Sequence, residues 1–112
     1  MDMMILGETL QLNSGTTHFG FWMPAGGNDG VASVEVFLLK TANLLTVTME
    51  SKPSNTNDGA ANAIGSVVLS STTPQVYKFD VAGANDLVRY TITASGSAYV
   101  HLQFAQPLWQ PN

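Results

Sequence analysis

Residue types that carry enzyme chemistry are sparse in this chain, which has two histidines, His18 and His101, and no cysteine. A Ser-His-Asp nucleophile needs a serine on a strained turn, and no G-x-S-x-G motif is present to supply one. The histidines also lack the H-x-x-x-H and H-E-x-x-H spacings of zinc sites. We therefore predict a protein that is not an enzyme and that binds no cofactor.

Oxygen ligands that would suit calcium occur in two places. One group is Asn55, Asn57 and Asp58, and the other is the Asn-Asp-Gly turn at residues 28–30. Neither group has the spacing of an EF-hand loop, and Asx-turns explain both equally well. We predict no metal site from these residues.

Aromatic side chains offer a different chemistry, because sugar-binding modules use exposed aromatic rings as stacking platforms. Trp22 lies beside a Gly- and Asn-rich segment, and Tyr99 lies on the more polar side of its strand. Tyr77 and Tyr90 fall on apolar faces and are predicted to be core residues. A carbohydrate-binding module that uses Trp22 and Tyr99 is therefore an alternative function.

Composition limits the partners that the chain can have. It has 112 residues, of which only 11% are charged, and a formal net charge of −4. This size predicts a single domain. The acidic balance gives no basic surface for nucleic acid, and the apolar start is too short for a membrane span. We expect neither a nucleic-acid partner nor a membrane partner.

The elements that position these residues are predicted to be strands. Leu45, Val47 and Met49 alternate with polar residues, which is the period of a strand with one buried and one exposed face. Turn signals rich in Gly, Asn, Ser and Pro separate similar runs. The predicted strands cover residues 8–12, 17–22, 33–39, 45–50, 64–69, 76–81, 88–93 and 99–104. The expected fold is all-β, an antiparallel, jelly-roll-like β-sandwich of about eight strands.

The longest polar stretch, residues 51–62, has no apolar anchor and is predicted to be an exposed loop. Arg89, on the polar face of its strand, has two interpretations. It could pair with a carboxylate of a partner, or with Glu50 or Asp80 of its own chain, and the internal pair is favoured.

Several strand sequences together resemble a known family. The sequence L-V-R-Y at residues 87–90 precedes a closing Y-V-H at residues 99–101, and an acidic-polar loop follows the strand at residues 44–52. This order resembles small β-sandwich proteins encoded among the head genes of tailed bacteriophages. The resemblance covers about two-thirds of the chain. It implies a non-enzymatic capsid decoration, or cement, protein in the virion that binds the major capsid protein and stabilises the shell.

The resemblance also directs attention to surfaces that could bind a partner. The single domain, residues 1–112, has apolar or proline-flanked ends at residues 1–7 and 105–112 that could act as arms on a neighbouring subunit, or could complete the domain's own sheet. Self-association, for example as a homotrimer, is a further expectation by analogy. A tail or baseplate component of the same virion is an alternative to a capsid protein. The predicted partner-binding residues are Met3, Met4, Ile5, Leu6, Trp22, Asn57, Asp58, Arg89, His101, Leu108 and Trp109.

Overall fold

The computed structural model of the chain describes residues 5–12, 17–41, 45–69, 75–95, 98–105 and 107–110. Within these residues the regular structure is β-strand, apart from a single 3-10 turn, η1 (Asp58–Ala60). The Thr-, Val- and Gly-rich sequence has a low helix propensity, which agrees with this outcome. Within the described ranges, no helix has the length and apolar character needed to span a bilayer. The predicted all-β class is confirmed.

One layer of the molecule, sheet A, is antiparallel and has the strand order β1-β9-β4-β7. A short strand, β10, follows β9 along the same edge of β4. The strands of this sheet are β1 (Ile5–Leu12), β4 (Gly30–Thr41), β7 (Gln75–Val81), β9 (Ala98–Phe104) and β10 (Leu108–Trp109).

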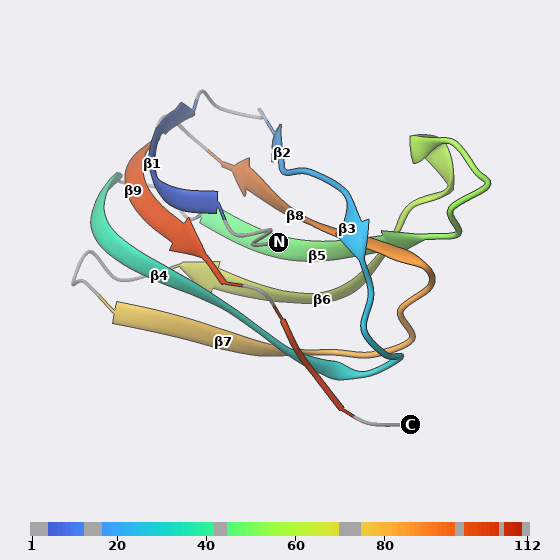
Figure 1. Ribbon diagram of the computed structural model, residues 1–112. Helices are drawn as coiled ribbons and strands as arrows, with labels where there is room; N and C mark the ends of the chain where they lie inside the picture. The colour runs from blue at the N-terminus through green and yellow to red at the C-terminus, as the bar shows by residue number, and fades with distance from the viewer. Residues whose placement is uncertain are drawn as a thin grey trace.

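The second layer, sheet B, is also antiparallel and has the order β2-β8-β5-β6, with β3 on the same edge of β8 as β2. Its strands are β2 (Thr17–Phe19), β3 (Met23–Pro24), β5 (Leu45–Lys52), β6 (Asn62–Leu69) and β8 (Leu87–Ala94). The two sheets form the predicted antiparallel β-sandwich (Figure 1).

Strand pairing in the sandwich is nested. β1 pairs with β9, β2 and β3 pair with β8, β4 pairs with β7, and β5 pairs with β6. The first strands along the chain therefore pair with the last ones, and the innermost pair is a local hairpin. Successive pairs lie alternately in sheet A and sheet B, so most connections pass from one layer to the other.

The core lies between the sheets and is filled by the apolar side of each strand. Val47 and Met49 from sheet B and Val34, Val36 and Leu102 from sheet A are almost fully buried. The period-2 pattern of residues 45–50 predicted that Val47 and Met49 face the core, and the structure confirms it. Tyr90 is also buried, as predicted, and it stacks on Phe104 at a centroid distance of 4.5 Å.

The Tyr90 hydroxyl group connects the two sheets. It donates to the Ala105 carbonyl oxygen at 2.6 Å and lies 3.2 Å from the Ser33 carbonyl oxygen, so a residue of β8 reaches backbone groups of sheet A. Burial raises the pKa of Tyr90 to about 12. The hydroxyl therefore remains protonated at neutral pH and can act as a donor.

The edge strands β6 of sheet B and β7 of sheet A approach each other closely at Gly65. A Cβ atom built on this residue of β6 would clash with the Asp80 carbonyl oxygen of β7. One backbone hydrogen bond, from the Ala82 N–H to the Ile64 oxygen at 3.1 Å, joins the same two segments. Glycine permits this contact because it has no side chain.

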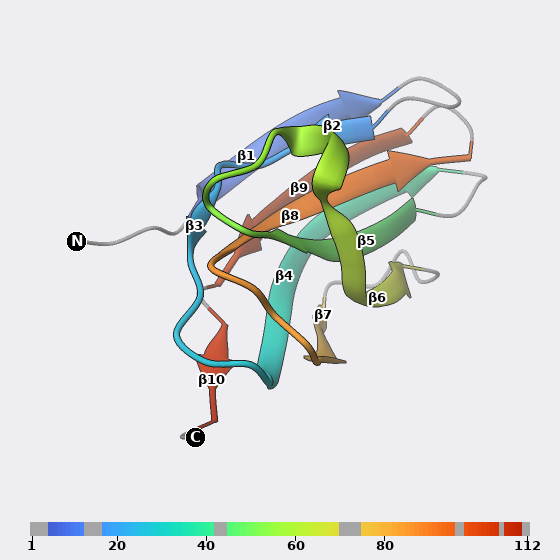
Figure 2. The ribbon, with the colours of Figure 1, turned by 90° about the vertical axis from the view of Figure 1, so that its right-hand side faces the viewer.

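Several boundaries differ from the sequence prediction; for example, β1 and β4 each begin three residues earlier than predicted. The predicted loop at 51–62 is shorter, because β5 continues through Ser51 and Lys52 and β6 begins at Asn62. The strand predicted at 17–22 ends at Phe19, and a separate short strand, β3, begins beyond it at Met23. β10 was not predicted, since two residues are too short to show a period. The connection from β5 to β6 lies beside the segment that leads into β3 (Figure 2).

Candidate functional site

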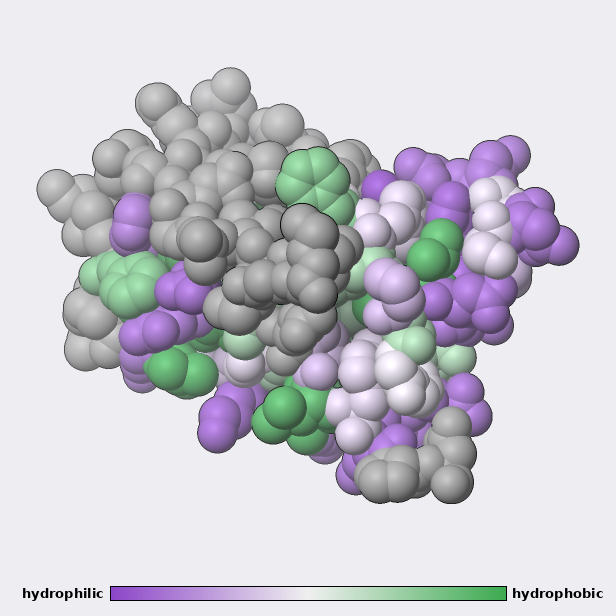
Figure 3. Space-filling model, viewed as in Figure 1, coloured by the Kyte–Doolittle hydropathy of each residue, from purple (hydrophilic) through white to green (hydrophobic). Residues whose placement is uncertain are grey.

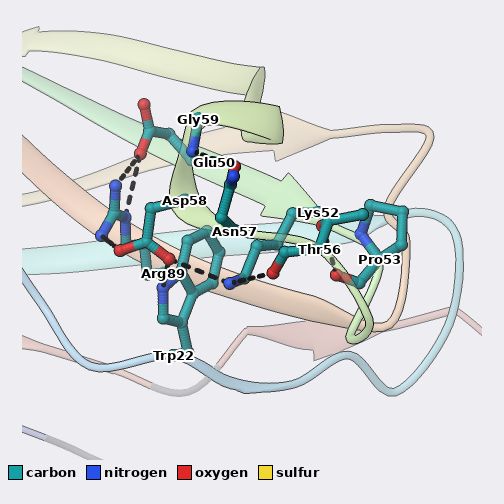
Figure 4. Close-up of polar contacts among 9 residues, drawn as sticks. All are labelled: Trp22, Glu50, Lys52, Pro53, Thr56, Asn57, Asp58, Gly59 and Arg89. Carbon is teal, nitrogen blue, oxygen red and sulfur yellow. Dashed lines mark hydrogen bonds and ion pairs between the residues drawn. The ribbon is translucent and has the colours of Figure 1, made fainter.

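A cluster of charged side chains and one indole lies on the outer face of sheet B, where β5 and β8 run side by side (Figure 4). We call it the Trp22 cluster, and its members are Trp22, Glu50, Lys52, Asp58 and Arg89. It combines two cations, two carboxylates and an aromatic ring in a chain that has few charges.

Strand register produces the first ion pair of the cluster. Glu50 of β5 stands directly opposite Arg89 of β8, and both side chains point away from the core. The Arg89 Nε and NH2 atoms each lie 2.9 Å from Glu50 Oε1. The internal partner that was favoured for Arg89 is thus confirmed, and it is Glu50. Asp80 belongs to the other sheet, where it pairs with Val31.

A local irregularity places Trp22 over this ion pair. Between the segments that pair with β8, three residues of the chain, 20–22, lie opposite two, Arg89 and Tyr90. An extra residue of this kind acts as a bulge and redirects the neighbouring side chains. The centre of the Trp22 ring lies 4.4 Å from Arg89 Cζ and 4.8 Å from Lys52 Nζ.

The indole helps to bury both cations. Arg89 is 8% exposed and Lys52 is 7% exposed, although both belong to the outer face of the sheet. Two cation–π contacts from one indole favour this arrangement, and such contacts are worth more when water is excluded. The aliphatic stems of both residues can pack against the sheet while their charged ends remain paired.

Asp58 joins the loop between β5 and β6 to the cluster. Its Oδ1 atom accepts from Lys52 Nζ at 2.9 Å and from Trp22 Nε1 at 3.0 Å, and its Oδ2 atom lies 3.5 Å from Arg89 NH1. The hydrogen bond from Lys52, with further contributions from Trp22 and the two positive charges, lowers the pKa of Asp58 below its ordinary value. Asp58 therefore remains ionised in the folded protein.

A second carboxylate holds the start of the same loop. Asp86 Oδ2, just before β8, accepts from the Ser54 backbone N–H at 3.0 Å and from the Ser54 hydroxyl at 3.1 Å. These hydrogen bonds lower the pKa of Asp86. Inside the loop, the Asn57 side chain accepts from the Gly59 N–H at 3.0 Å and caps η1. The loop is thus fastened by polar contacts, and η1 has no buried residue.

The contacts of the Trp22 cluster are structural, because they hold the loop between β5 and β6 against sheet B. The charges of the cluster balance, two cations against two carboxylates, and each carboxylate contacts a cation. Asp58 faces cations and an indole, which does not suit calcium, and Asn57 serves as an Asx cap. Within the described part of the chain, no group of three His, Cys, Asp or Glu side chains could hold a metal ion.

The outer face of sheet A has a different character, and we call it the apolar face. Its exposed hydrophobic residues are Phe37 (40% exposed), Val76 (52%) and Leu108 (77%). Register places them on the outside, because Val76 lies opposite Glu35 and Leu108 lies opposite Val31. The His101 ring lies 5.3 Å from the Phe37 ring. In Figure 3 hydrophobic patches alternate with hydrophilic ones at the lower left, over β4 and β7.

The structure brings together four of the predicted partner-binding residues, Trp22, Asn57, Asp58 and Arg89, in and beside the Trp22 cluster. His101 and Leu108 belong to the apolar face instead. Sequence reasoning missed Lys52, because residues 51–62 were predicted to form an exposed loop. Continuing the alternation of Thr46, Thr48 and Glu50 by one step would have placed Lys52 on the same outer face.

Both predicted arms contribute to sheet A where they are described. Ile5 begins β1, which includes Leu6 and pairs with β9, while Met3 and Met4 lie outside the described residues. Trp109 pairs with Gly30, and its indole packs on Gly26. In these segments the chain completes its own sheet, which was one of the two expectations. The side chain of Tyr99, the second predicted sugar platform, is outside the described set.

Comparison with known proteins adds no family to this picture. No protein-family model matches the chain, and no curated protein matches its sequence.

Proposed function

We propose that the chain is a non-enzymatic virion structural protein that decorates a bacteriophage capsid and stabilises it by binding the major capsid protein. The observation that carries the proposal is the apolar face. Phe37, Val76 and Leu108 expose large hydrophobic side chains on one side of a rigid sandwich. Aromatic residues such as Phe37 are enriched in protein-binding surfaces, where apolar groups are surrounded by polar ones.

The energetics of such docking are reasonable for a decoration protein. Full burial of each of these three side chains would contribute roughly 1 kcal/mol or more. A single copy would therefore bind weakly or moderately once the cost of association is included. A capsid offers many equivalent sites, and self-association of the decoration protein would add avidity without new contacts.

The strand order supports the same proposal in a general way. Nested pairing of first strands with last strands, distributed over two five-stranded layers, fits a jelly roll. This architecture occurs among viral capsid proteins and lectins. Since a fold hosts many functions, the apolar face is the more specific argument.

The Trp22 cluster has a supporting part in this proposal. It fastens the loop between β5 and β6 to sheet B through Asp58 and so keeps that side of the molecule closed. A loop that is already ordered loses little conformational entropy when the protein docks. In this proposal the cluster stiffens the domain, and the opposite sheet contacts the shell.

Co-sedimentation with capsid shells that lack this protein tests the proposal. We expect the purified chain to pellet with the shells and the Val76→Lys variant to bind at least about tenfold more weakly, because a charge enters the interface. Val68→Lys is the matched control, since Val68 is also an exposed strand valine (43%) but belongs to sheet B.

Two results would contradict the proposal. One is the absence of any co-sedimentation of the unmodified chain with shells. The other is equal loss of binding in Val76→Lys and Val68→Lys, which would show that the apolar face has no special role. Binding to isolated tails with no binding to shells would point to a tail component.

A further inference from the structure

An apolar hollow lies between β3 of sheet B and β10 of sheet A, which are on the same side of the molecule (Figure 2). Its volume is about 230 Å³, and its lining residues are Met23, Pro24, Ala25, Gly26, Pro107 and Trp109. None of these residues carries a charge, and the indole of Trp109 forms part of the wall. A space with this lining favours an apolar occupant. We call it the Trp109 hollow.

The walls of the Trp109 hollow are held in place without any ligand. On the side of β3, Met23 is only 6% exposed, and the Ala25 N–H donates to the Asp86 carbonyl oxygen at 2.9 Å. On the side of β10, the Gln110 N–H donates to the Asp29 carbonyl oxygen at 2.9 Å. Both walls therefore belong to the hydrogen-bonded framework of the domain. A site that is formed in advance lowers the entropy cost of binding.

The direction of β1 leads the residues before it toward the hollow. β1 is antiparallel to β9, and Ile5 lies opposite Phe104. The chain before Ile5 therefore leaves β1 at the end where β9 continues to Pro107 and β10. Residues 1–4, which lie outside the described residues, can span roughly 13 Å when extended. The path from Phe104 to Pro107 is three residues, or at most roughly 11 Å, so this segment is long enough to reach the hollow.

Strand periodicity predicts which side chain of this segment faces the hollow. Phe104 is 2% exposed, so the position opposite it on β1 belongs to the core side of sheet A. Successive residues of a strand alternate between its two faces. When this alternation is continued upstream of Ile5, Met3 falls on the core side and Met4 falls on the outer side.

The wall that β10 contributes lies on the same side of sheet A. Leu108 is 77% exposed, whereas its neighbours Pro107 and Trp109 line the hollow. Alternation along β10 therefore places these two residues on the side that faces sheet B. Met3 and the Trp109 wall thus share one side of the sheet.

We propose that residues 1–4 dock on their own chain and place the Met3 side chain in the Trp109 hollow, against the indole. Methionine is unbranched and flexible, so it fills irregular apolar spaces, and its sulfur makes favourable contacts with aromatic rings. Met4 and Asp2 face the outer side.

The tether to β1 favours this occupant over a segment from another molecule. A short link between two binding groups gives an effective concentration of about millimolar, which a second copy or a capsid protein in dilute solution does not match. Docking of this kind extends sheet A with the chain's own residues and leaves Phe37 and Val76 exposed for a partner. The inference is therefore independent of capsid binding.

Nuclear magnetic resonance of the full chain with ¹³C-labelled methionine methyl groups tests the proposal. The chain has five methionines, and replacement of each one in turn by leucine assigns the five signals. We expect the Met3 methyl signal to be shifted upfield by the ring current of the indole and to show a nuclear Overhauser effect to the Trp109 ring protons. The Met4 methyl signal should lie at the position of a solvent-exposed methionine.

A matched pair of variants separates docking from a general effect of the segment. Met3→Ser removes the apolar side chain and should shift the Trp109 ring signals. Met4→Ser makes the same change on the neighbouring residue and should leave these signals unchanged, because its position faces outward. Met3→Leu keeps an apolar side chain of similar size and should keep the Trp109 signals close to those of the unmodified chain.

Three outcomes would overturn the proposal. The first is a Met3 methyl signal with neither the upfield shift nor the contact to Trp109. The second is an equal change of the Trp109 signals in Met3→Ser and Met4→Ser. The third is a contact between labelled Met3 and the Trp109 of unlabelled molecules in a mixed sample, which would assign the hollow to the segment of a second copy. All three readouts use the isolated protein, so they do not depend on the result with shells.

Discussion

The outer faces of the two sheets differ in which side chains are buried and which are exposed. On sheet B, Lys52 and Arg89, two of the four cations of the chain, are paired with Glu50 and Asp58 and buried beneath Trp22. On sheet A, Phe37 and Val76 are left exposed. A loop of the same chain covers part of sheet B, although Val68 on its edge strand β6 is exposed, whereas sheet A exposes three large hydrophobic side chains. In our proposal, sheet B therefore serves internal stability and sheet A serves association.

The largest effect is expected from Arg89→Met, which keeps an unbranched side chain but removes the cation. Glu50 would lose its partner while it remains mostly buried, and Asp58 would lose one of its two cations. We expect a loss of about 2 to 3 kcal/mol in the free energy of unfolding, measured by urea denaturation. Lys78→Met, an exposed cation of sheet A, is the control and should change stability by less than about 0.5 kcal/mol. Equal effects would contradict the comparison.

A smaller loss is expected from Tyr90→Phe, which tests the connection between the two faces. The variant keeps the ring stacked on Phe104 but leaves the Ala105 carbonyl oxygen without its hydroxyl donor. Loss of this buried hydrogen bond should cost about 1 to 2 kcal/mol in urea denaturation. An unchanged denaturation midpoint would show that water replaces the hydroxyl group.

The raised pKa of Tyr90 predicts that the stability of the protein falls at alkaline pH. The pKa of Tyr90 is about 12 in the folded protein, against an ordinary value of 10.0. Because the unfolded chain ionises first, stability is complete below pH 10 and falls as the pH rises from 10 toward 12. Thermal unfolding between these pH values should show a steeper decline for the unmodified chain than for Tyr90→Phe.

The sequence predicted the sandwich well because the core uses a period that can be read locally. Val47 and Met49 alternate with threonines, and such a pattern fixes which face of a strand is buried. The pairing of Arg89 with Glu50 was also foreseen as one of two internal options. Asp80 could be rejected only after strand order was known, because order depends on contacts between segments far apart in the chain.

Other parts of the site could not be predicted from sequence for physical reasons. The position of Trp22 depends on an extra residue opposite β8, and a bulge of this kind leaves no periodic signal. The hydrogen bonds between residues 25–29 and residues 83–86 join segments that are more than fifty positions apart. A tertiary contact between two turns cannot be predicted from the sequence of either turn alone.

The contacts of Asp58 and Asp86 should make the stability of the protein depend on pH in the acid range. The pKa values of Asp58 and Asp86 are both lowered from 3.8, so their contacts contribute stability above that value. This contribution is lost as the pH falls below about 4 and through the lowered values in the folded state. We expect Asp58→Asn to lower the free energy of unfolding at neutral pH by less than Tyr90→Phe does. We also expect the stability of Asp58→Asn to fall less steeply below about pH 4 than that of the unmodified chain. Urea denaturation at neutral and acidic pH, followed by tryptophan fluorescence, measures both, and an equally steep fall would contradict the role of Asp58 in holding the loop.

The smallest effect on stability is expected from Val76→Lys on the apolar face. Val76 is already exposed, and the introduced ammonium group would stand opposite Glu35 on β4, so the free energy of unfolding should change by less than about 0.5 kcal/mol. Val68→Lys on β6, opposite Thr46, should behave in the same way. Urea denaturation of the two variants in parallel measures this. If both remain as stable as the unmodified chain while only Val76→Lys fails to bind shells, the binding defect belongs to the lost apolar contact. A large destabilisation by Val76→Lys would instead make the apolar face part of the fold's own support.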